Sequence, residues 1–143
     1  MLDPDRPDDL HDVIEAFYFA YRGFTDRPDR ILERRGLGRV HHRILYFIGR
    51  RPDVSVRGLL DLLAVSKQAL NAPLRQLLEM HLVTAIPAAE DRRVKNLRLT
   101  PDGQRLEAEL TGAQTRHLQA ALDRAAPEDA RGWRAVMAQL AKG

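Results

Sequence analysis

The segment from Ser55 to Gly103 ends with Asp91-Arg92-Arg93-Val94-Lys95-Asn96-Leu97-Arg98-Leu99-Thr100-Pro101-Asp102-Gly103. Upstream of this run, leucines at helical spacing predict two helices, over 55–63 and from 66 to about 81, joined by a tight turn at Ala64-Val65. Alternation of apolar and polar residues predicts strands over 82–86 and 94–100, with a polar loop between them. A helix pair followed by a two-stranded ribbon with arginines at its tip has the shape of a winged helix-turn-helix, a form that meets duplex DNA.

Composition indicates one folded domain. The chain has 143 residues, of which 44% are hydrophobic and 30% charged, and it contains no cysteine. Disulfides and thiolate metal sites are therefore excluded. No apolar run approaches the roughly 18 residues of a membrane span, and the acidic start of the chain has no secretory signal pattern. A cytoplasmic location without membrane contact is expected.

The net charge of +3 is unevenly distributed along the chain. Residues 1–35 hold six basic and nine acidic side chains, and residues 100–143 hold six of each. Residues 36–99 hold eleven basic and five acidic side chains, a net charge of +6. Clustered positive charge is typical of a surface that binds a polyanion, although a solvated surface with chance clustering gives the same count.

Helical patterns flank the central segment on both sides. Apolar residues predict a helix over 9–24, a break at 25–28 and a short helix over 29–35 that stops at Gly36, and then a helix over 38–49. Thr100-Pro101 starts a long helix and Pro127 starts the last one. We expect a mainly α fold with a small β-wing, in which 36–100 is the winged helix-turn-helix and 1–35 with 101–143 forms a helical dimerisation region.

The second helix of the pair carries the candidate base-reading side chains. Ser66 is its expected N-cap, as Ser55 is for the first helix, and either hydroxyl can also donate to a phosphate. With the leucines turned inward, the outward positions are Lys67, Gln68, Asn71 and Arg75. Gln and Asn pair with adenine, whereas Arg and Lys prefer guanine. Pro73 lies inside this helix and predicts a kink or loosened first turns.

The loop of the ribbon carries the candidate groove contacts. Arg92 and Arg93 near the tip, with Lys95 and Arg98 on the ribbon, can enter a minor groove or line its phosphates. An acid at Asp91 is unusual on such a loop. We expect it to pair with a neighbouring arginine or to accept loop amide hydrogens, so that the tip holds one shape.

These motifs together resemble the MarR family of bacterial transcriptional regulators. The resemblance covers about residues 10–140 and depends mainly on the wing run Asp91-Arg92-Arg93 and on Leu97–Gly103; the stretch Gly36–Arg43 is similar to a PetP-like branch. It implies a homodimer with interlocked terminal helices that binds a pseudo-palindromic operator, often as a repressor released by a small molecule. Ala64 stands where a turn glycine is frequent, and Ala72 where many members have arginine.

The same resemblance implies an effector site between the dimerisation helices and the winged domain. Aromatic residues beside an arginine are the candidates for an aromatic or acidic effector: Tyr18, Tyr21, Arg22, His42 and Tyr46. Ordinary packing at a helix interface explains the same residues.

Other functional classes find less support. His41 and His42 point about 100° apart on a helix, so a metal site needs further ligands from elsewhere, and none is expected. No nucleophile–base pair or phosphate-binding glycine loop indicates an enzyme or a cofactor site. The predicted function is a sequence-specific regulator of transcription that binds double-stranded DNA. The alternative is a winged-helix module for protein–protein interaction that does not bind DNA.

Overall fold

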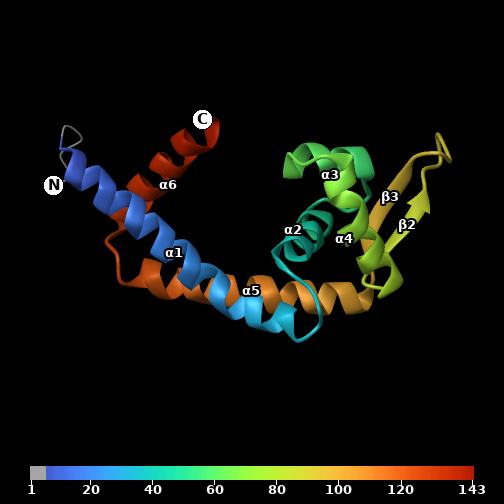
Figure 1. The fold of residues 1–143 in the computed structure, drawn as a ribbon, viewed down its shortest axis with the longest axis horizontal. Coiled ribbons are helices and arrows are strands. Elements are labelled where there is room, and N and C mark those ends of the chain that lie inside the picture. The colour runs from blue at the N-terminus through green and yellow to red at the C-terminus, as the bar shows by residue number, and fades with distance from the viewer. Residues whose placement is uncertain (1–5) are drawn as a thin grey trace.

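The computed structural model describes residues 6–143, so the predicted frayed start of the chain, residues 1–8, lies largely outside the described range. Two long helices, α1 and α5, run side by side in opposite directions, with the winged domain at one end and α6 at the other (Figure 1). The elements are α1 Pro7–Glu33, α2 Arg39–Arg50, β1 Val54–Ser55, α3 Val56–Leu63, α4 Lys67–Glu79, β2 Val83–Pro87, β3 Lys95–Leu99, α5 Pro101–Asp123 and α6 Pro127–Lys142.

The wing is a three-stranded antiparallel sheet rather than the two-stranded ribbon expected. Its order is β1-β3-β2, with Val83 opposite Leu99 and Pro87 opposite Lys95. The short extended stretch before α3 supplies the third strand, where Val54 pairs with Leu97. A two-residue strand is too short to show alternation, which is why the sequence pattern indicated only an extended segment.

The helix pair forms as its capping residues predict. The Ser55 and Ser66 hydroxyls accept the backbone N–H groups of Gly58 at 3.0 Å and Ala69 at 3.1 Å. Ala64 adopts the left-handed conformation at the turn, with φ 53° and ψ 41°. The inward leucines of α4 are buried, and α4 remains one helix across Pro73. The ends of both helices are therefore set by residues readable in the sequence.

The junction between β3 and α5 contains no loop residue beyond Thr100. Its hydroxyl accepts the Gly103 N–H at 3.0 Å and donates to the His81 carbonyl at 2.6 Å, and its own N–H donates to the Leu82 carbonyl at 3.1 Å. A Cβ on Gly103 would lie 1.9 Å from the Leu82 oxygen. Only glycine at this position allows the start of α5 to lie this close to the backbone just before β2. The predicted helix start at Thr100-Pro101 therefore depends on Gly103.

The predicted break at 25–28 is wrong, because α1 continues through Pro28 to Glu33. A proline removes one backbone donor, and here its buried ring lies in the part of α1 that packs along α5. That packing outweighs the local cost. The predicted stop at Gly36 is confirmed: φ is 71°, and the Leu37 and Gly36 N–H groups donate to the carbonyls of Leu32 and Glu33.

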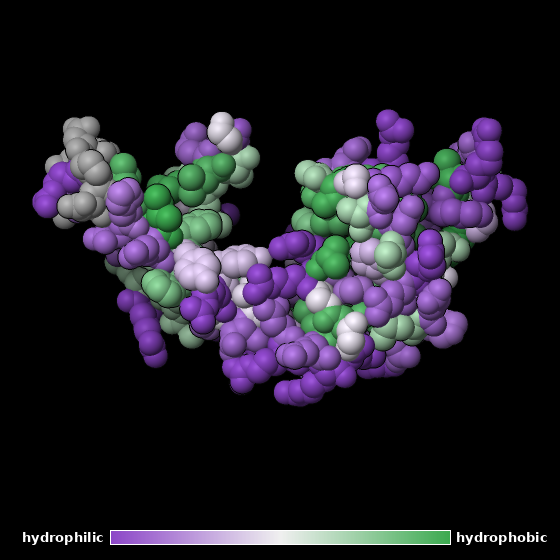
Figure 2. Space-filling view, in the orientation of Figure 1, coloured by the Kyte–Doolittle hydropathy of each residue, from purple (hydrophilic) through white to green (hydrophobic). Residues whose placement is uncertain are grey.

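The core and the exposed apolar surface lie in different places. Buried side chains from α2, α4, β3 and α5 pack into one cluster beneath the winged domain. In contrast, no residue of α6 is buried, and the first half of α1 is exposed. Figure 2 shows hydrophobic side chains gathered along α6 and the adjacent start of α1. The exposed apolar residues there include Leu10, Val13, Ile14, Phe17, Trp133, Val136, Met137 and Leu140.

Candidate nucleic-acid interface

The start of α4 presents the predicted polar side chains to solvent. Lys67, Gln68, Asn71 and Arg75 are all exposed, while Leu70 on the other face is fully buried. Within residues 6–143, none of these four side chains has a hydrogen-bond or ion-pair partner. Their donors and acceptors are thus available to a ligand on the outer face of the helix-turn-helix.

The wing loop holds Arg93 in a defined orientation. Asp91 accepts from the Arg93 backbone N–H at 3.0 Å and from its Nε and Nη2 at 3.1 Å each. Hydrogen bonding to Arg93 holds the pKa of Asp91 below its ordinary value. The Arg93 side chain is still 91% exposed. Both expected roles of Asp91, pairing with an arginine and accepting a loop amide, are confirmed.

Arg92 and Lys95 complete the cationic loop. Both are exposed, and Lys95 Nζ donates to the Arg92 carbonyl at 3.3 Å, which joins the base of the loop to its tip. The loop and the first residue of β3 therefore carry three exposed cationic side chains, Arg92, Arg93 and Lys95. In Figure 1 the loop between β2 and β3 points away from α5, on the same side of the molecule as α3.

A second ion pair at the base of the wing was not predicted. Asp53 accepts from Arg98 Nε at 2.6 Å and Nη2 at 2.8 Å, and its N–H donates to the Leu97 carbonyl at 3.1 Å. Asp53 has φ 70°, so the turn before β1 adopts a backbone conformation that non-glycine residues rarely enter. The two residues are 45 positions apart, and only the three-stranded pairing brings them together.

His41 connects α2 to α4. Its Nδ1 accepts the Gly38 N–H at 2.9 Å, so Nε2 carries the proton and donates to Gln76 Oε1 at 2.9 Å. Gln76 in turn donates to the Gly36 carbonyl at 3.2 Å. A buried histidine with two such partners is a structural group, and within the described residues no set of three His, Asp or Glu side chains is grouped as metal ligands would be.

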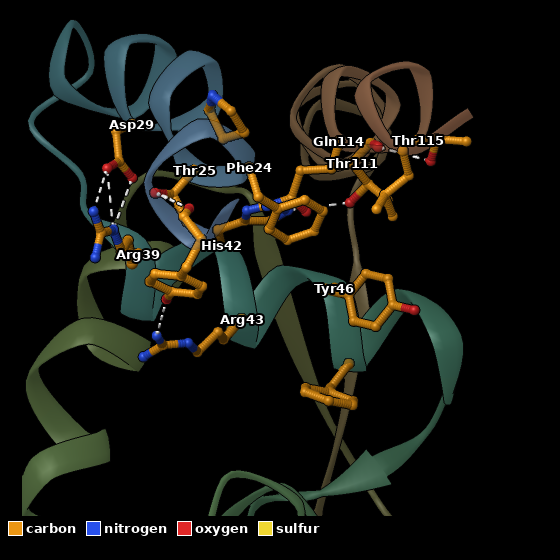
Figure 3. A pocket seen from close by; sticks show the side chains of 14 residues that line it. Phe24, Thr25, Asp29, Arg39, His42, Arg43, Tyr46, Thr111, Gln114 and Thr115 are labelled. Carbon is orange, nitrogen blue, oxygen red and sulfur yellow. Dashed lines mark hydrogen bonds and ion pairs between the residues drawn. The ribbon is translucent and has the colours of Figure 1, made fainter. Parts of the chain in front are cut away.

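A cavity of about 360 Å³ lies between α1, α2 and α5 (Figure 3). Of the five predicted effector residues, Tyr21, His42 and Tyr46 line it, whereas Tyr18 and Arg22 do not. Its cationic residues are Arg39 and Arg43, which the sequence reading missed. The remaining lining residues are Phe24, Thr25, Pro28, Asp29, Phe47, Thr111, Gln114, Thr115 and Leu118.

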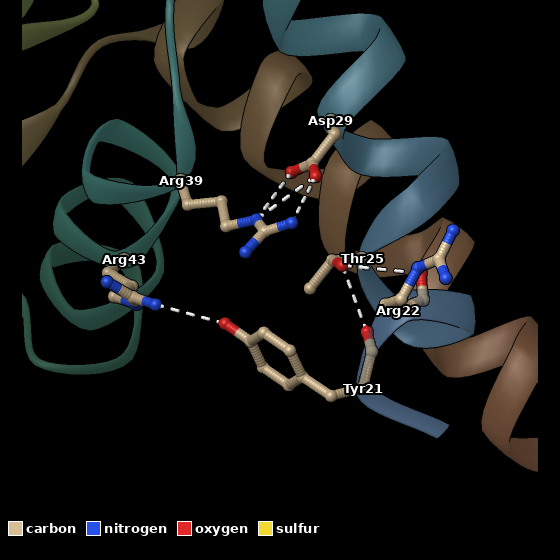
Figure 4. Close-up of polar contacts among 6 residues, drawn as sticks. All are labelled: Tyr21, Arg22, Thr25, Asp29, Arg39 and Arg43. Carbon is tan, nitrogen blue, oxygen red and sulfur yellow. Dashed lines mark hydrogen bonds and ion pairs between the residues drawn. The ribbon is translucent and has the colours of Figure 1, made fainter. Parts of the chain in front are cut away.

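Polar contacts organise one side of this cavity (Figure 4). Arg39 Nε and Nη2 donate to the Asp29 carboxylate at 2.8 to 3.1 Å, and Arg43 Nη2 donates to the Tyr21 hydroxyl at 3.1 Å. Arg43 has no acidic partner in the described part of the chain. A guanidinium with free donors beside aromatic rings suits an anionic group on an apolar ligand.

His42 lies on the cavity wall in its neutral form. Its Nε2 is 3.1 Å from the Thr111 hydroxyl of α5. Burial, and then the nearby Arg43 charge, lower the pKa of His42, and Asp29 opposes this shift only in part. The wall at this point is therefore polar but uncharged at neutral pH.

The free side chains of α4, the wing and the three-stranded sheet define a winged helix-turn-helix protein. Residues 35–94 match the model of the MarR family. The chain is 44% identical over 128 residues to the HTH-type transcriptional regulator PetP of Rhodobacter capsulatus, covering 90% of this chain and 77% of that protein. The chain belongs to the MarR family of helix-turn-helix transcriptional regulators.

Solved structures share the fold at low identity. Streptococcus pneumoniae FabT in complex with DNA has a TM-score of 0.80 at 17% identity, covering 93% of this chain and 95% of that one. Staphylococcus aureus MarR in complex with salicylate and kanamycin has a TM-score of 0.74 at 24% identity, with coverages of 93% and 90%. Within residues 6–143, no helix is long and apolar enough to cross a membrane.

Proposed function

We propose that the protein is a homodimeric repressor that binds a pseudo-palindromic operator in double-stranded DNA and is released by a small-molecule effector. Residues 36–100 bind the DNA, and residues 1–35 with 101–143 form the dimer. The observation that carries the proposal is the wing tip, where Asp91 orients Arg93 while leaving its guanidinium exposed. A loop that only faces solvent does not need an acidic residue to fix one of its arginines. Asp91 holds Arg93 in an orientation suited to insertion into a narrow minor groove of DNA.

The recognition helix supplies the sequence preference in this proposal. Lys67, Gln68 and Asn71 are free and exposed at the N-terminal end of α4, the end that meets base edges in helix-turn-helix proteins. Ser55 and Ser66, which cap the two helices, and Arg75 are assigned to phosphates. Ala72 and Pro73 on α4 make its outer surface unlike that of an arginine-bearing relative, so the operator is expected to differ as well.

The dimer follows from the exposed apolar surface of α1 and α6. Leu10, Ile14 and Phe17 on α1 and Val136 and Leu140 on α6 are each 46 to 64% exposed. Apolar surface on α6, which has no buried residue, and on the exposed first half of α1 is typical of a subunit interface. A two-fold assembly also places two recognition helices about 34 Å apart, one turn of DNA, as a pseudo-palindrome requires.

The effector site is assigned to the cavity between α1, α2 and α5. Arg43 and the Tyr21 hydroxyl offer donors, and Tyr46 with Phe24 offers apolar surface, which suits an aromatic or acidic molecule. The S. aureus relative was solved with salicylate, an aromatic acid. Tyr18 and Arg22 do not line this cavity. They could contact the effector only if the second subunit of the dimer brought them to it.

The test is fluorescence anisotropy with labelled duplex from upstream of the gene, titrated between 50 and 200 mM salt. We expect steep salt dependence, and a loss of affinity in the Arg92→Ala/Arg93→Ala double variant together with a slope lower by about one per phosphate contact removed. The Arg124→Ala/Lys142→Ala variant removes the same charge at the far end of the molecule and serves as the control. Binding that ignores salt, or no binding to any duplex, would favour the protein–protein module instead, and equal losses in both variants would overturn the role of the wing.

A further inference from the structure

The α1–α5 pair has a second cavity on the face opposite the one just described. Positions two apart on a helix differ by about 200° in direction. Thr111 and Thr115 of α5 line the cavity beside α2, whereas Ala113 and His117 line a cavity of about 670 Å³ on the other face. Hydrophilic side chains project from the lower edge of the molecule in Figure 2, where α1 and α5 run. We refer to this second cavity as the α1–α5 groove.

The charge of the α1–α5 groove is strongly one-sided. Four guanidinium groups and one imidazole line it, and Asp26 is the acidic residue among them. Asp26 is already paired with Arg30, which leaves three cationic side chains without an acidic partner in the described range. These are Arg22, Arg27 and Arg116.

Hydrogen-bond donors from both α1 and α5 line the groove. Arg22 and Arg27 come from α1, and Arg116 and His117 come from α5. Gly23 has no side chain, so the His117 ring lies against α1, and a Cβ at Gly23 would be 3.5 Å from its Nε2. Phe24, Pro28 and Ala113 form apolar surface between the cations. The guanidinium groups of Arg22, Arg27 and Arg116 are exposed, so solvent reduces the repulsion between them. None of the three has an acidic partner in the described range that would neutralise its charge.

We propose that the α1–α5 groove binds a small organic anion with at least two negative charges, carried on phosphate or carboxylate groups. Guanidinium groups match the geometry of both anions, and one bound anion would neutralise charges from both helices at once. The groove lies on the face of α1 and α5 turned away from α2 and the winged domain, so its ligand is distinct from operator DNA and from the effector proposed above. The proposal does not depend on either of those assignments.

The test is isothermal titration of the full chain with citrate and with tripolyphosphate, each at constant ionic strength, with acetate as the monovalent reference. We expect saturable binding of at least one of the two probes, with one site per chain and no saturation by acetate. The probe that binds more tightly identifies carboxylate or phosphate as the preferred group. The Arg27→Gln/Arg116→Gln variant should weaken that binding at least tenfold, because it removes one donor from each helix.

Two controls keep the outcome decisive. Arg124→Gln/Lys142→Gln removes equal charge outside the groove and should change the probe affinity less than twofold. The His117 ring Cε1–H resonance, assigned with a His117→Gln variant, should shift when the probe is added to the parent chain. Equal weakening in the groove and control variants, an unmoved His117 resonance, or no saturable heat would each overturn the proposal. A loss of duplex binding in the groove variant as large as in the wing variant would assign the groove to DNA and overturn it too.

Discussion

The contact between Gly103 and Leu82 makes a quantitative prediction for Gly103→Ala. The added Cβ would lie 1.9 Å from the Leu82 oxygen and 2.9 Å from its carbonyl carbon, against about 3.3 Å for an ordinary carbon–oxygen contact. The start of α5 must therefore move from β2 by more than about 1 Å. Such a shift weakens three hydrogen bonds of Thr100, to Gly103, His81 and Leu82.

These losses set the size of the effect. Three hydrogen bonds at about 1 kcal/mol each are offset by about 1 kcal/mol, since alanine is the better helix former. We expect the free energy of unfolding to fall by about 2 kcal/mol, within the usual range for overpacking, and Tm to fall by roughly 6 °C. Urea unfolding followed by circular dichroism at 222 nm measures this, at one fixed protein concentration because subunit association contributes.

Gly132→Ala is the matched control, because nothing lies within 4 Å of a Cβ at that position in α6. It should leave the protein as stable as the parent or more stable by up to about 1 kcal/mol. The reasoning is refuted if Gly103→Ala unfolds within about 0.5 kcal/mol of the parent, or if both variants lose the same stability.

Three further predictions follow from the same structure. Because the pKa of His42 is lowered in the native state, the unfolded chain takes up a proton on this side chain at a higher pH than the native chain does. The contribution of neutral His42 to stability is therefore present above about pH 6.5 and is lost as pH falls. In His42→Gln, the urea midpoint should therefore fall less between pH 7 and pH 5 than in the parent, and an unchanged profile would contradict this. Ser66→Ala removes the α4 cap and should cost about 1 kcal/mol in the same urea assay. Ile14→Asp, on the exposed face of α1, should convert a dimer to a monomer in light scattering, whereas the surface change Glu109→Gln should not.

Local chemistry explains which parts of the fold could be predicted. Ser55, Ser66 and Thr100 cap helices through their own hydroxyls, and Gly36 ends α1 with φ 71°, so a few neighbouring residues determine each boundary. Pro28 shows the opposite case. Its local preference predicts a break, but the packing of α1 on α5 decides the outcome, and a sequence pattern does not contain that packing.

The candidate sites divide in the same way. The four outward residues of α4 and the pairing of Asp91 with Arg93 were readable because helix periodicity and a two-residue separation determine them. Their contact with DNA stays a prediction. Arg39 and Arg43 were not predicted as cavity residues. Asp29 lies in α1 and Arg39 in α2, so the pairing of these two residues crosses a helix end and a turn, and helix periodicity in the sequence does not reveal it. The same holds for Asp53 and Arg98, which meet through strand pairing alone.

The direct passage from β3 into α5 at Thr100 makes the wing a lever on that helix. β3 has five residues, about 17 Å of extended chain, and the loop continues beyond it. If α5 turns about this joint by roughly 10°, a rigid strand of that length sweeps about 3 Å at its far end. Thr111 and Gln114 of α5 line the cavity beside α2, about 17 and 21 Å along the helix from this joint, so a molecule seated there would push on an arm of similar length. A displacement of about 3 Å at Arg93 is the distance between a hydrogen bond and none.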